Sequence, residues 1–253
     1  MNLHVERSGT GPDLVLLHGW GLHSGVWSEL LPALASRHRV HAIDLPGHGR
    51  SAAIPVQGFD AAVEQVATLV PERSIVCGWS LGGLVAQRLA RLRPGKVRAL
   101  ALVSTTPCFV QREGWTDAMK ATTHAAFAAG LRENRGATLD RFVRLSALNG
   151  ARSREAIRAF TRRLEDRGAP SAKALDATLQ WLLEVDLRKD TGALDLPALV
   201  IHGARDALAP VAAGRWLAAR LPRATLLELP DAAHLPFFTH RDPFVETLES
   251  FVA

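Results

Sequence analysis

The stretch Ser74-Ile75-Val76-Cys77-Gly78-Trp79-Ser80-Leu81-Gly82-Gly83-Leu84 decides the fold. Its first four residues form a short apolar run typical of a buried strand, and residues 84–90 have the pattern of a helix. A strand that turns at once into a helix forces Ser80, at the turn, into a strained backbone conformation that holds its hydroxyl over the sheet edge. Glycine is expected at positions 78 and 82, because a side chain there would collide with the neighbouring strand or helix. We therefore expect Ser80 to be a catalytic nucleophile.

Short apolar runs alternate with helical patterns on both sides of this stretch. Such alternation is typical of a parallel sheet with helices on both faces. The expected strands are 14–17, 39–44, 74–77, 97–103, 197–201 and 224–229. The expected helices around them are 27–35, 84–90, 212–220 and 243–251. The sequence predicts an α/β fold with a doubly wound, mostly parallel sheet.

The alternation stops between residues 107 and 190, where the sequence is helical and rich in arginine and alanine. Breaks are expected at Gly130, Gly136, Asn149-Gly150 and Gly168-Ala169-Pro170. We predict a core made of residues 1–106 and 191–253, and a helical cap, residues 107–190, inserted between the sixth and seventh strands.

Composition excludes several classes of protein. A chain of 253 residues with 47% hydrophobic and 22% charged residues fits one large globular domain and argues against a disordered chain. No apolar run approaches the ~20 residues that span a bilayer, and the first residues lack the pattern of a signal peptide. Two cysteines, Cys77 and Cys108, are expected to be buried small hydrophobes. We expect a cytoplasmic monomer with no membrane or nucleic-acid partner.

A serine nucleophile needs a base that accepts its proton and a carboxylate that orients the base. In an open parallel sheet these groups follow the carboxyl ends of the strands, in the chain order serine, acid, histidine. His234 follows the strand at 224–229 and is the expected base. Asp206 follows the strand at 197–201 and is favoured as the acid, because it comes from the adjacent strand end. Asp231 is the alternative, on the same loop as His234.

Ester hydrolysis also needs hydrogen-bond donors for the negative oxygen that forms on the attacked carbonyl. The residue after the nucleophile supplies one backbone N–H, and the loop after the first long strand supplies the second. The expected donors are the N–H groups of Leu81 and Trp20, with the Trp20 indole at the floor of the pocket.

Several motifs occur in the order found in α/β-hydrolases. They are His18-Gly19-Trp20-Gly21, Asp44-Leu45-Pro46-Gly47-His48-Gly49-Arg50-Ser51, the turn at Ser80, Gly203-Ala204-Arg205-Asp206 and His234. The chain resembles that superfamily over almost its whole length. Within it, the chain is similar to the esterase family of biotin synthesis that acts on a methyl ester of a pimeloyl chain bound to acyl-carrier protein. This likeness rests on residues 19–27, the Gly-Trp-Ser-Leu-Gly-Gly turn, Pro107-Cys108-Phe109 with Trp115, residues 141–145 and Val185-Asp186-Leu187-Arg188.

The resemblance implies a serine carboxylesterase that releases methanol and leaves a free carboxylate, without a metal or an organic cofactor. It also implies the residues that line the acyl chain, which are Trp20, Leu81, Phe142, Val143, Arg144, Leu145, Ser146 and His234. Ser146 departs from the family pattern, in which glutamine is more usual, so a polar contact there is in question.

Arginines gather in the expected cap. Residues 130–168 contain ten arginines, no lysine and five acidic residues, so this stretch carries a net charge equal to the +5 of the whole chain. Arg154 and Arg158 are four residues apart and share one helix face. Acyl-carrier proteins are acidic and present a phosphate, which arginine binds well. By resemblance, Arg141, Arg154 and Arg158 are expected to contact the carrier; the alternative is an ordinary solvated helix face.

Two other functions remain open at this stage. One is a general short-chain carboxylesterase, or another Ser-His-Asp hydrolase, that acts on a free small substrate. The other is a non-enzymatic binding module that keeps the hydrolase fold.

Overall fold

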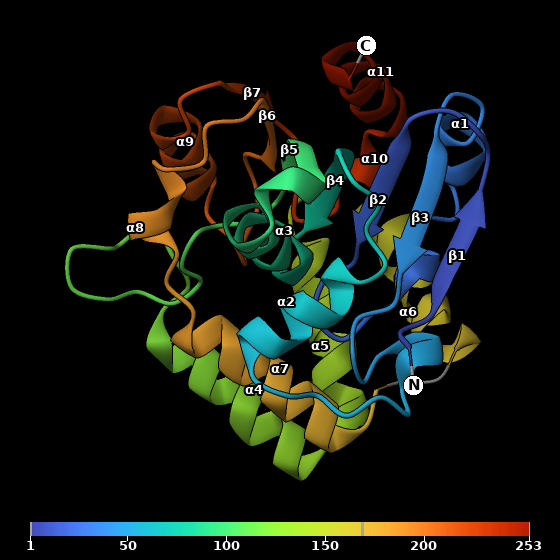
Figure 1. The fold of residues 1–253 in the computed structure, drawn as a ribbon. Coiled ribbons are helices and arrows are strands. Elements are labelled where there is room, and N and C mark those ends of the chain that lie inside the picture. Colours follow the sequence, from blue (N-terminus) through green and yellow to red (C-terminus); the bar gives the residue numbers. More distant parts are fainter. Residues whose placement is uncertain (1, 168–169, 253) are drawn as a thin grey trace.

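The structure, a computed structural model, describes residues 2–167 and 170–252 and contains one seven-stranded sheet in them (Figure 1). Its strands are β1 (Val5–Ser8), β2 (Asp13–Leu17), β3 (Arg39–Ile43), β4 (Ser74–Trp79), β5 (Val97–Val103), β6 (Ala198–Gly203) and β7 (Ala224–Leu229). They are ordered β1-β3-β2-β4-β5-β6-β7. Strand β1 pairs with β3 in antiparallel fashion, and all other neighbours are parallel. The prediction of a doubly wound, mostly parallel sheet is confirmed.

All six expected strands are present, and the described residues contain one further strand, the edge strand β1. Three of the four residues of β1 are polar, so the strand lacks the apolar run that marks the others. The helical insertion lies between β5 and β6, the fifth and sixth strands. The expected place between the sixth and seventh strands is wrong, because only the five strands β1 to β5 precede the insertion in the described residues.

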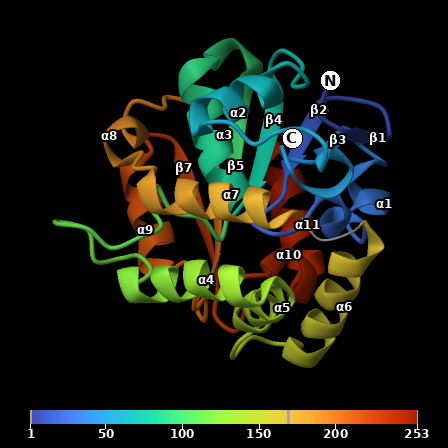
Figure 2. The ribbon, with the colours of Figure 1, turned by 90° about the horizontal axis from the view of Figure 1, so that it is seen from below.

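Helices cover both faces of the sheet. Around the core they are α1 (Leu31–Leu34), α2 (Phe59–Ala67), α3 (Leu81–Leu92), α9 (Val211–Arg220), α10 (Pro236–Thr239) and α11 (Arg241–Val252), with the 3-10 turns η1 (Ser24–Trp27), η2 (Gly49–Ser51) and η3 (Pro94–Lys96). Figure 2 shows α2 and α3 on one side of the sheet and α10 and α11 on the other. The helix expected at 27–35 is instead split into η1 and the short α1, where Pro32 lies in the first turn.

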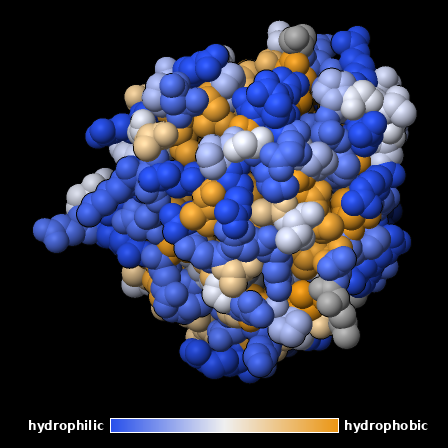
Figure 3. Space-filling model, viewed as in Figure 1, coloured by the Kyte–Doolittle hydropathy of each residue, from blue (hydrophilic) through white to orange (hydrophobic). Residues whose placement is uncertain are grey.

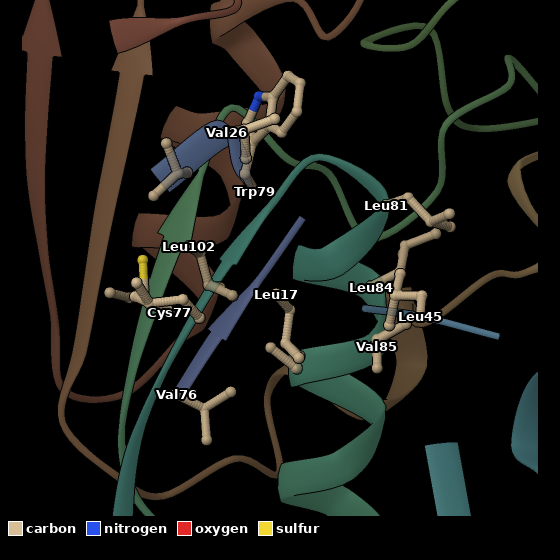
Figure 4. Packing of buried hydrophobic residues seen from close by; sticks show 14 of the residues in the cluster. Leu17, Val26, Leu45, Val76, Cys77, Trp79, Leu81, Leu84, Val85 and Leu102 are labelled. Carbon is tan, nitrogen blue, oxygen red and sulfur yellow. The ribbon is translucent and has the colours of Figure 1, made fainter. Parts of the chain in front are cut away.

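The central strands form the interior of the molecule. Strands β2, β4 and β5 are almost entirely buried, which explains their continuous apolar runs. Figure 4 shows Trp79 at the end of β4 near Val26, whereas Leu84 and Val85 project from α3 beside Leu45. The two cysteines, Cys77 and Cys108, are buried and form no disulfide, as expected.

Within the described residues, five helices lie between β5 and β6. They are α4 (Ala121–Glu133), α5 (Arg135–Ser146), α6 (Ser153–Asp166), α7 (Ala172–Glu184) and α8 (Arg188–Thr191). Helices α4 to α7 lie together beyond one end of the sheet (Figures 1 and 2). The residues before α4 form two isolated bridges, Val110 with Met119 and Arg112 with Trp115. We keep residues 107–190 as the proposed extent of the cap.

The breaks between the cap helices only partly follow the expectation. Gly130 and Gly136 lie inside α4 and α5, and the break falls at Asn134, whose side chain caps α5 by accepting from the Ala137 N–H at 3.0 Å. The expected break at Asn149-Gly150 is present, and Asn149 has a φ of 60°. Residues 168 and 169 of the last expected break, Gly168-Ala169-Pro170, lie outside the described residues.

The surface is mostly hydrophilic on the face that Figure 3 shows, where hydrophobic residues gather only in small separate patches. None of the helices in residues 2–167 and 170–252 combines the length and the hydrophobicity that crossing a bilayer requires.

Candidate active site

Ser80 lies in the sharp turn between β4 and α3. Its φ of 54° and ψ of −118° lie outside the regions that L-residues normally occupy. Both neighbouring glycines are explained by crowding: a Cβ on Gly78 would lie 2.3 Å from the Gly82 carbonyl oxygen, and one on Gly82 would lie 2.4 Å from that of Leu17. The Thr105 hydroxyl donates to the Ser80 carbonyl at 2.7 Å. The surroundings therefore hold the strained turn in place.

His234 and Asp206 form a buried hydrogen-bonded pair. Nδ1 of His234 lies 2.7 Å from Oδ2 of Asp206, and both side chains are fully buried. The other carboxylate oxygen, Oδ1, accepts from the backbone N–H groups of Leu208 and Ala209, each at 2.9 Å. Burial by itself raises the pKa of Asp206, but attraction to His234 and the hydrogen bonds outweigh it and hold that pKa below its ordinary value. Asp206 therefore faces His234 as a carboxylate.

The second candidate acid, Asp231, faces a different histidine. Its Oδ1 lies 2.8 Å from Nε2 of His240, at the surface. Of the two aspartates that the sequence left open, the structure brings only Asp206 to His234.

Ser80 and His234 line the same cavity. Among the residues that the structure describes, Nε2 of His234 has no hydrogen-bond partner, so this nitrogen is free to accept a proton. The backbone of His234 is held from two sides: its N–H donates to the Ser146 carbonyl at 3.0 Å, and its carbonyl accepts from the Trp79 indole at 2.8 Å.

The two expected oxyanion donors come from different parts of the chain, Leu81 from the start of α3 and Trp20 from the loop after β2. Leu81 is the first residue of α3, where backbone N–H groups have no partner within the helix. Its side chain is fully buried and does not line the cavity. Trp20 does line it, and its indole donates to the Leu175 carbonyl of α7 at 3.0 Å. The indole thus forms one wall, with its ring against Phe142 at a centroid distance of 5.1 Å.

Buried histidines support the Trp20 loop from behind. The His18 ring donates from Nδ1 to the Gly19 carbonyl at 2.8 Å and accepts the Leu45 N–H on Nε2 at 2.9 Å. The centroids of the His18 and His48 rings are 5.3 Å apart. Burial is the main cause that lowers the pKa of His18 to about 3 and that of His48 to about 4. Both histidines are therefore neutral at pH 7.

The cavity lies between the sheet edge and the cap and is almost wholly apolar. It is lined by Trp20, Ser80, Phe109, Val110, Met119, His124, Phe127, Phe142, Leu179, Leu182, Leu208 and His234. Its free volume is about 30 Å³, enough for a water molecule but not for an acyl chain. An acyl substrate therefore requires that cap side chains or helices move apart.

Most of the cap residues that line this cavity were not expected from the sequence. His124 and Phe127 are three residues apart on α4, as are Leu179 and Leu182 on α7. Such spacing marks the inner face of a helix, and it was the available signal. The spacing does not tell whether such a face borders the cavity or packs against another helix.

Of the lining stretch implied by the resemblance, only Phe142 borders the cavity in this structure. Val143 is buried in the core, Leu145 packs against that core, and Arg144 is exposed and paired with Asp140 at 2.7 Å. Ser146 is buried, and its hydroxyl donates to the Phe142 carbonyl at 2.8 Å.

The three arginines expected to contact a carrier are all exposed on the cap. Arg141 lies on α5 with its guanidinium 5.4 Å from the Phe127 ring centroid, and Arg154 and Arg158 lie on α6. Within the described residues, none of the three has a carboxylate within 4.0 Å, unlike their neighbours Arg152 and Arg163. Their positive charges are therefore available to an external partner.

Comparisons with known proteins agree with this geometry. The model of a family described as alpha/beta hydrolase fold matches residues 12–241. The pimeloyl-[acyl-carrier protein] methyl ester esterase of Chromobacterium violaceum is 45% identical, over 98% of this chain and 97% of its own length. The protein of the same name from Nitrosomonas europaea is 40% identical, over 98% of this chain and 99% of its own length.

Solved structures show the same fold. A bromoperoxidase from Bacillus anthracis superposes with a TM-score of 0.90 at 25% identity, covering 99% of this chain and 95% of that chain. An esterase from Exiguobacterium antarcticum gives 0.89 at 23% identity with the same coverage. The chain belongs to the α/β-hydrolase family and, within it, to the group of pimeloyl-[acyl-carrier protein] methyl ester esterases.

Proposed function

We propose that this protein hydrolyses the methyl ester of a pimeloyl chain carried on acyl-carrier protein, giving methanol and the free carboxylate. One observation carries the proposal: the buried Asp206–His234 pair and the strained Ser80 meet at one apolar cavity. The names of the full-length relatives support the choice of substrate.

In the proposed first half-reaction, Ser80 Oγ attacks the ester carbonyl while His234 Nε2 takes the hydroxyl proton. Asp206 orients the histidine and stabilises its charged form. The N–H groups of Trp20 and Leu81 donate to the carbonyl oxygen as it becomes negative. The tetrahedral intermediate then collapses, His234 returns the proton to the leaving oxygen, and methanol departs.

In the second half-reaction a water molecule attacks the acyl-enzyme. His234 takes a proton from the water and returns it to Ser80 as the carboxylate is released. Trp20 and Phe142 are the proposed walls for the acyl chain, because both border the cavity and contact each other. All these groups come from one chain, so we propose a monomer, located in the cytoplasm with its carrier.

The proposal predicts that Ser80→Ala removes essentially all methanol release from the carrier-bound methyl ester. A fluorophosphonate probe should label the wild type at Ser80 and leave the variant unlabelled. Activity of Ser80→Ala within tenfold of wild type would refute the catalytic assignment. Absence of labelling in the wild type would instead favour a non-enzymatic binding module.

The carrier-docking part rests on the exposed arginines. Reversing two charges on α6, with Arg154→Glu and Arg158→Glu, should raise KM for the carrier-bound ester by about tenfold or more. KM for a short free ester should stay unchanged. Arg223→Glu is the matched control, because Arg223 is exposed just before β7, at the end of the strands away from the cap. Equal KM for the carrier substrate in all three proteins would favour a general carboxylesterase.

A further inference from the structure

His124 places a polar group in a cavity wall that is otherwise apolar. Apart from Ser80 and His234, the lining residues with polar side-chain groups are Trp20 and His124. The Trp20 indole nitrogen is already bonded to the Leu175 carbonyl. His124 is therefore the remaining lining residue with a polar side-chain group to offer a substrate.

The hydrogen bonding of His124 fixes which atom is left free. Its Nε2 lies 3.0 Å from the Leu179 carbonyl of α7. Because a carbonyl can only accept, Nε2 carries the hydrogen, and in the neutral ring Nδ1 is left as an acceptor. Among the described residues Nδ1 has no hydrogen-bond partner.

Nδ1 is not among the fully buried polar atoms of the described residues, so it is open to a water molecule or a ligand group. The free volume of about 30 Å³ accommodates a water molecule. A substrate that fills the cavity displaces that water. It regains the lost hydrogen bond only if it carries a donor at the same place.

We propose that His124 is a specificity-determining residue that accepts a hydrogen bond from an N–H or O–H group on the acyl side of the ester. The proposal rests on the function proposed above only in taking Ser80 as the ester-cleaving nucleophile. Two sources offer this donor: a hydroxyl on the acyl chain, or the first amide N–H of a pantetheine arm attached through a thioester.

Two substrate pairs distinguish these sources. In the first, the methyl ester of a straight-chain acid with a terminal hydroxyl is compared with the same ester carrying a terminal methoxy group, which cannot donate. In the second, the pimeloyl methyl ester thioester of pantetheine is compared with its analogue whose amide nitrogen nearest the sulfur is methylated. For each pair the ratio of kcat/KM is measured, and this ratio is independent of the fraction of folded enzyme.

The wild type should favour the donor-bearing member of at least one pair by about tenfold, equivalent to about 1.4 kcal/mol, mainly through KM. His124→Leu should bring that ratio close to one. His124→Gln, which keeps both an acceptor and a donor, should retain part of it. Thr122→Leu, on the exposed side of the same helix turn, should leave the ratio as in wild type.

A preference confined to the first pair assigns the donor to the acyl chain, and one confined to the second assigns it to the arm. The proposal is overturned if the wild type shows no preference in either pair, or if His124→Leu keeps the preference unchanged. Aryl esters of the hydroxy and methoxy acids provide the same comparison on activated substrates. The role of His124 is thereby tested even if methyl esters or the carrier prove not to be the substrate.

Discussion

The two walls of the cavity are held in place by different kinds of interaction. On the sheet side, specific hydrogen bonds fix the three residues: Ser80 accepts from the Thr105 hydroxyl, and Asp206 accepts from the Leu208 N–H. The His234 N–H donates to the Ser146 carbonyl at the end of α5. On the cap side, residues such as Phe127 and Leu182 are positioned chiefly by apolar packing between helices. Packing tolerates substitution and movement better than a strained turn does. The chemistry is thus fixed by the core, and the choice of substrate is left to an adaptable cap.

Breaking the pair on the sheet side should have the largest effect. Asp206→Asn removes the carboxylate that orients His234, and we expect kcat to fall by about 10³ to 10⁴ with the fold intact. Asp231→Asn is the matched control, because it breaks only a surface pair with His240, and it should change kcat less than about threefold. Steady-state kinetics on a short aryl ester measures both. A larger loss of kcat in Asp231→Asn than in Asp206→Asn would assign the acid role to Asp231.

The rigidity of the sheet side can be compared with the cap through one glycine from each. Gly82→Ala places a Cβ 2.4 Å from the Leu17 carbonyl oxygen, and we expect it to lower the free energy of unfolding by about 2–3 kcal/mol. Gly136→Ala, in the first turn of α5, meets nothing closer than 3.6 Å and should raise it by about 0.5 kcal/mol. Urea unfolding followed by circular dichroism measures both. Equal changes in the free energy of unfolding for the two variants would show that the two regions do not differ in rigidity.

The same division explains what the sequence could predict. The Ser80 turn, Asp206 and His234 were found because strand ends, glycines and chain order are local signals. The cavity wall depends on how helices far apart in the sequence pack, so Phe142 was found by resemblance, while His124 and Leu179 were missed. The choice between Asp206 and Asp231 needed the actual direction of two side chains. Edge strand β1 lacked an apolar run and was missed for that reason.

The histidines behind the Trp20 loop make the stability of the sheet side dependent on pH. The pKa values of His18 and His48, about 3 and 4, lie below the ordinary value of about 6.5. The unfolded chain therefore binds more protons than the folded one between pH 6.5 and 4. Stability is fully present above pH 6.5 and should fall by about 1.4 kcal/mol per pH unit for each histidine as the pH drops through this window.

Unfolding experiments at pH 7.5 and pH 5 give this slope, and His48→Gln should reduce it. A slope that is the same in wild type and variant would mean that other groups control the acid sensitivity.

The cap side should respond to substitution with a smaller change, in chain-length preference. Met119 lines the cavity from the loop before α4, where its N–H donates to the Phe109 carbonyl at 2.9 Å. Met119→Ala keeps that backbone bond and removes apolar atoms from the cavity wall. The cavity, which is too small for an acyl chain, thereby becomes larger. Space for one more methylene contributes about 0.8 kcal/mol to binding, so KM for longer free methyl esters should fall about fourfold. Met119→Leu, which nearly conserves volume, should keep the wild-type profile. A chain-length profile in Met119→Ala that matches wild type would mean that helix movement, and not the loop side chain, limits the space for the acyl chain.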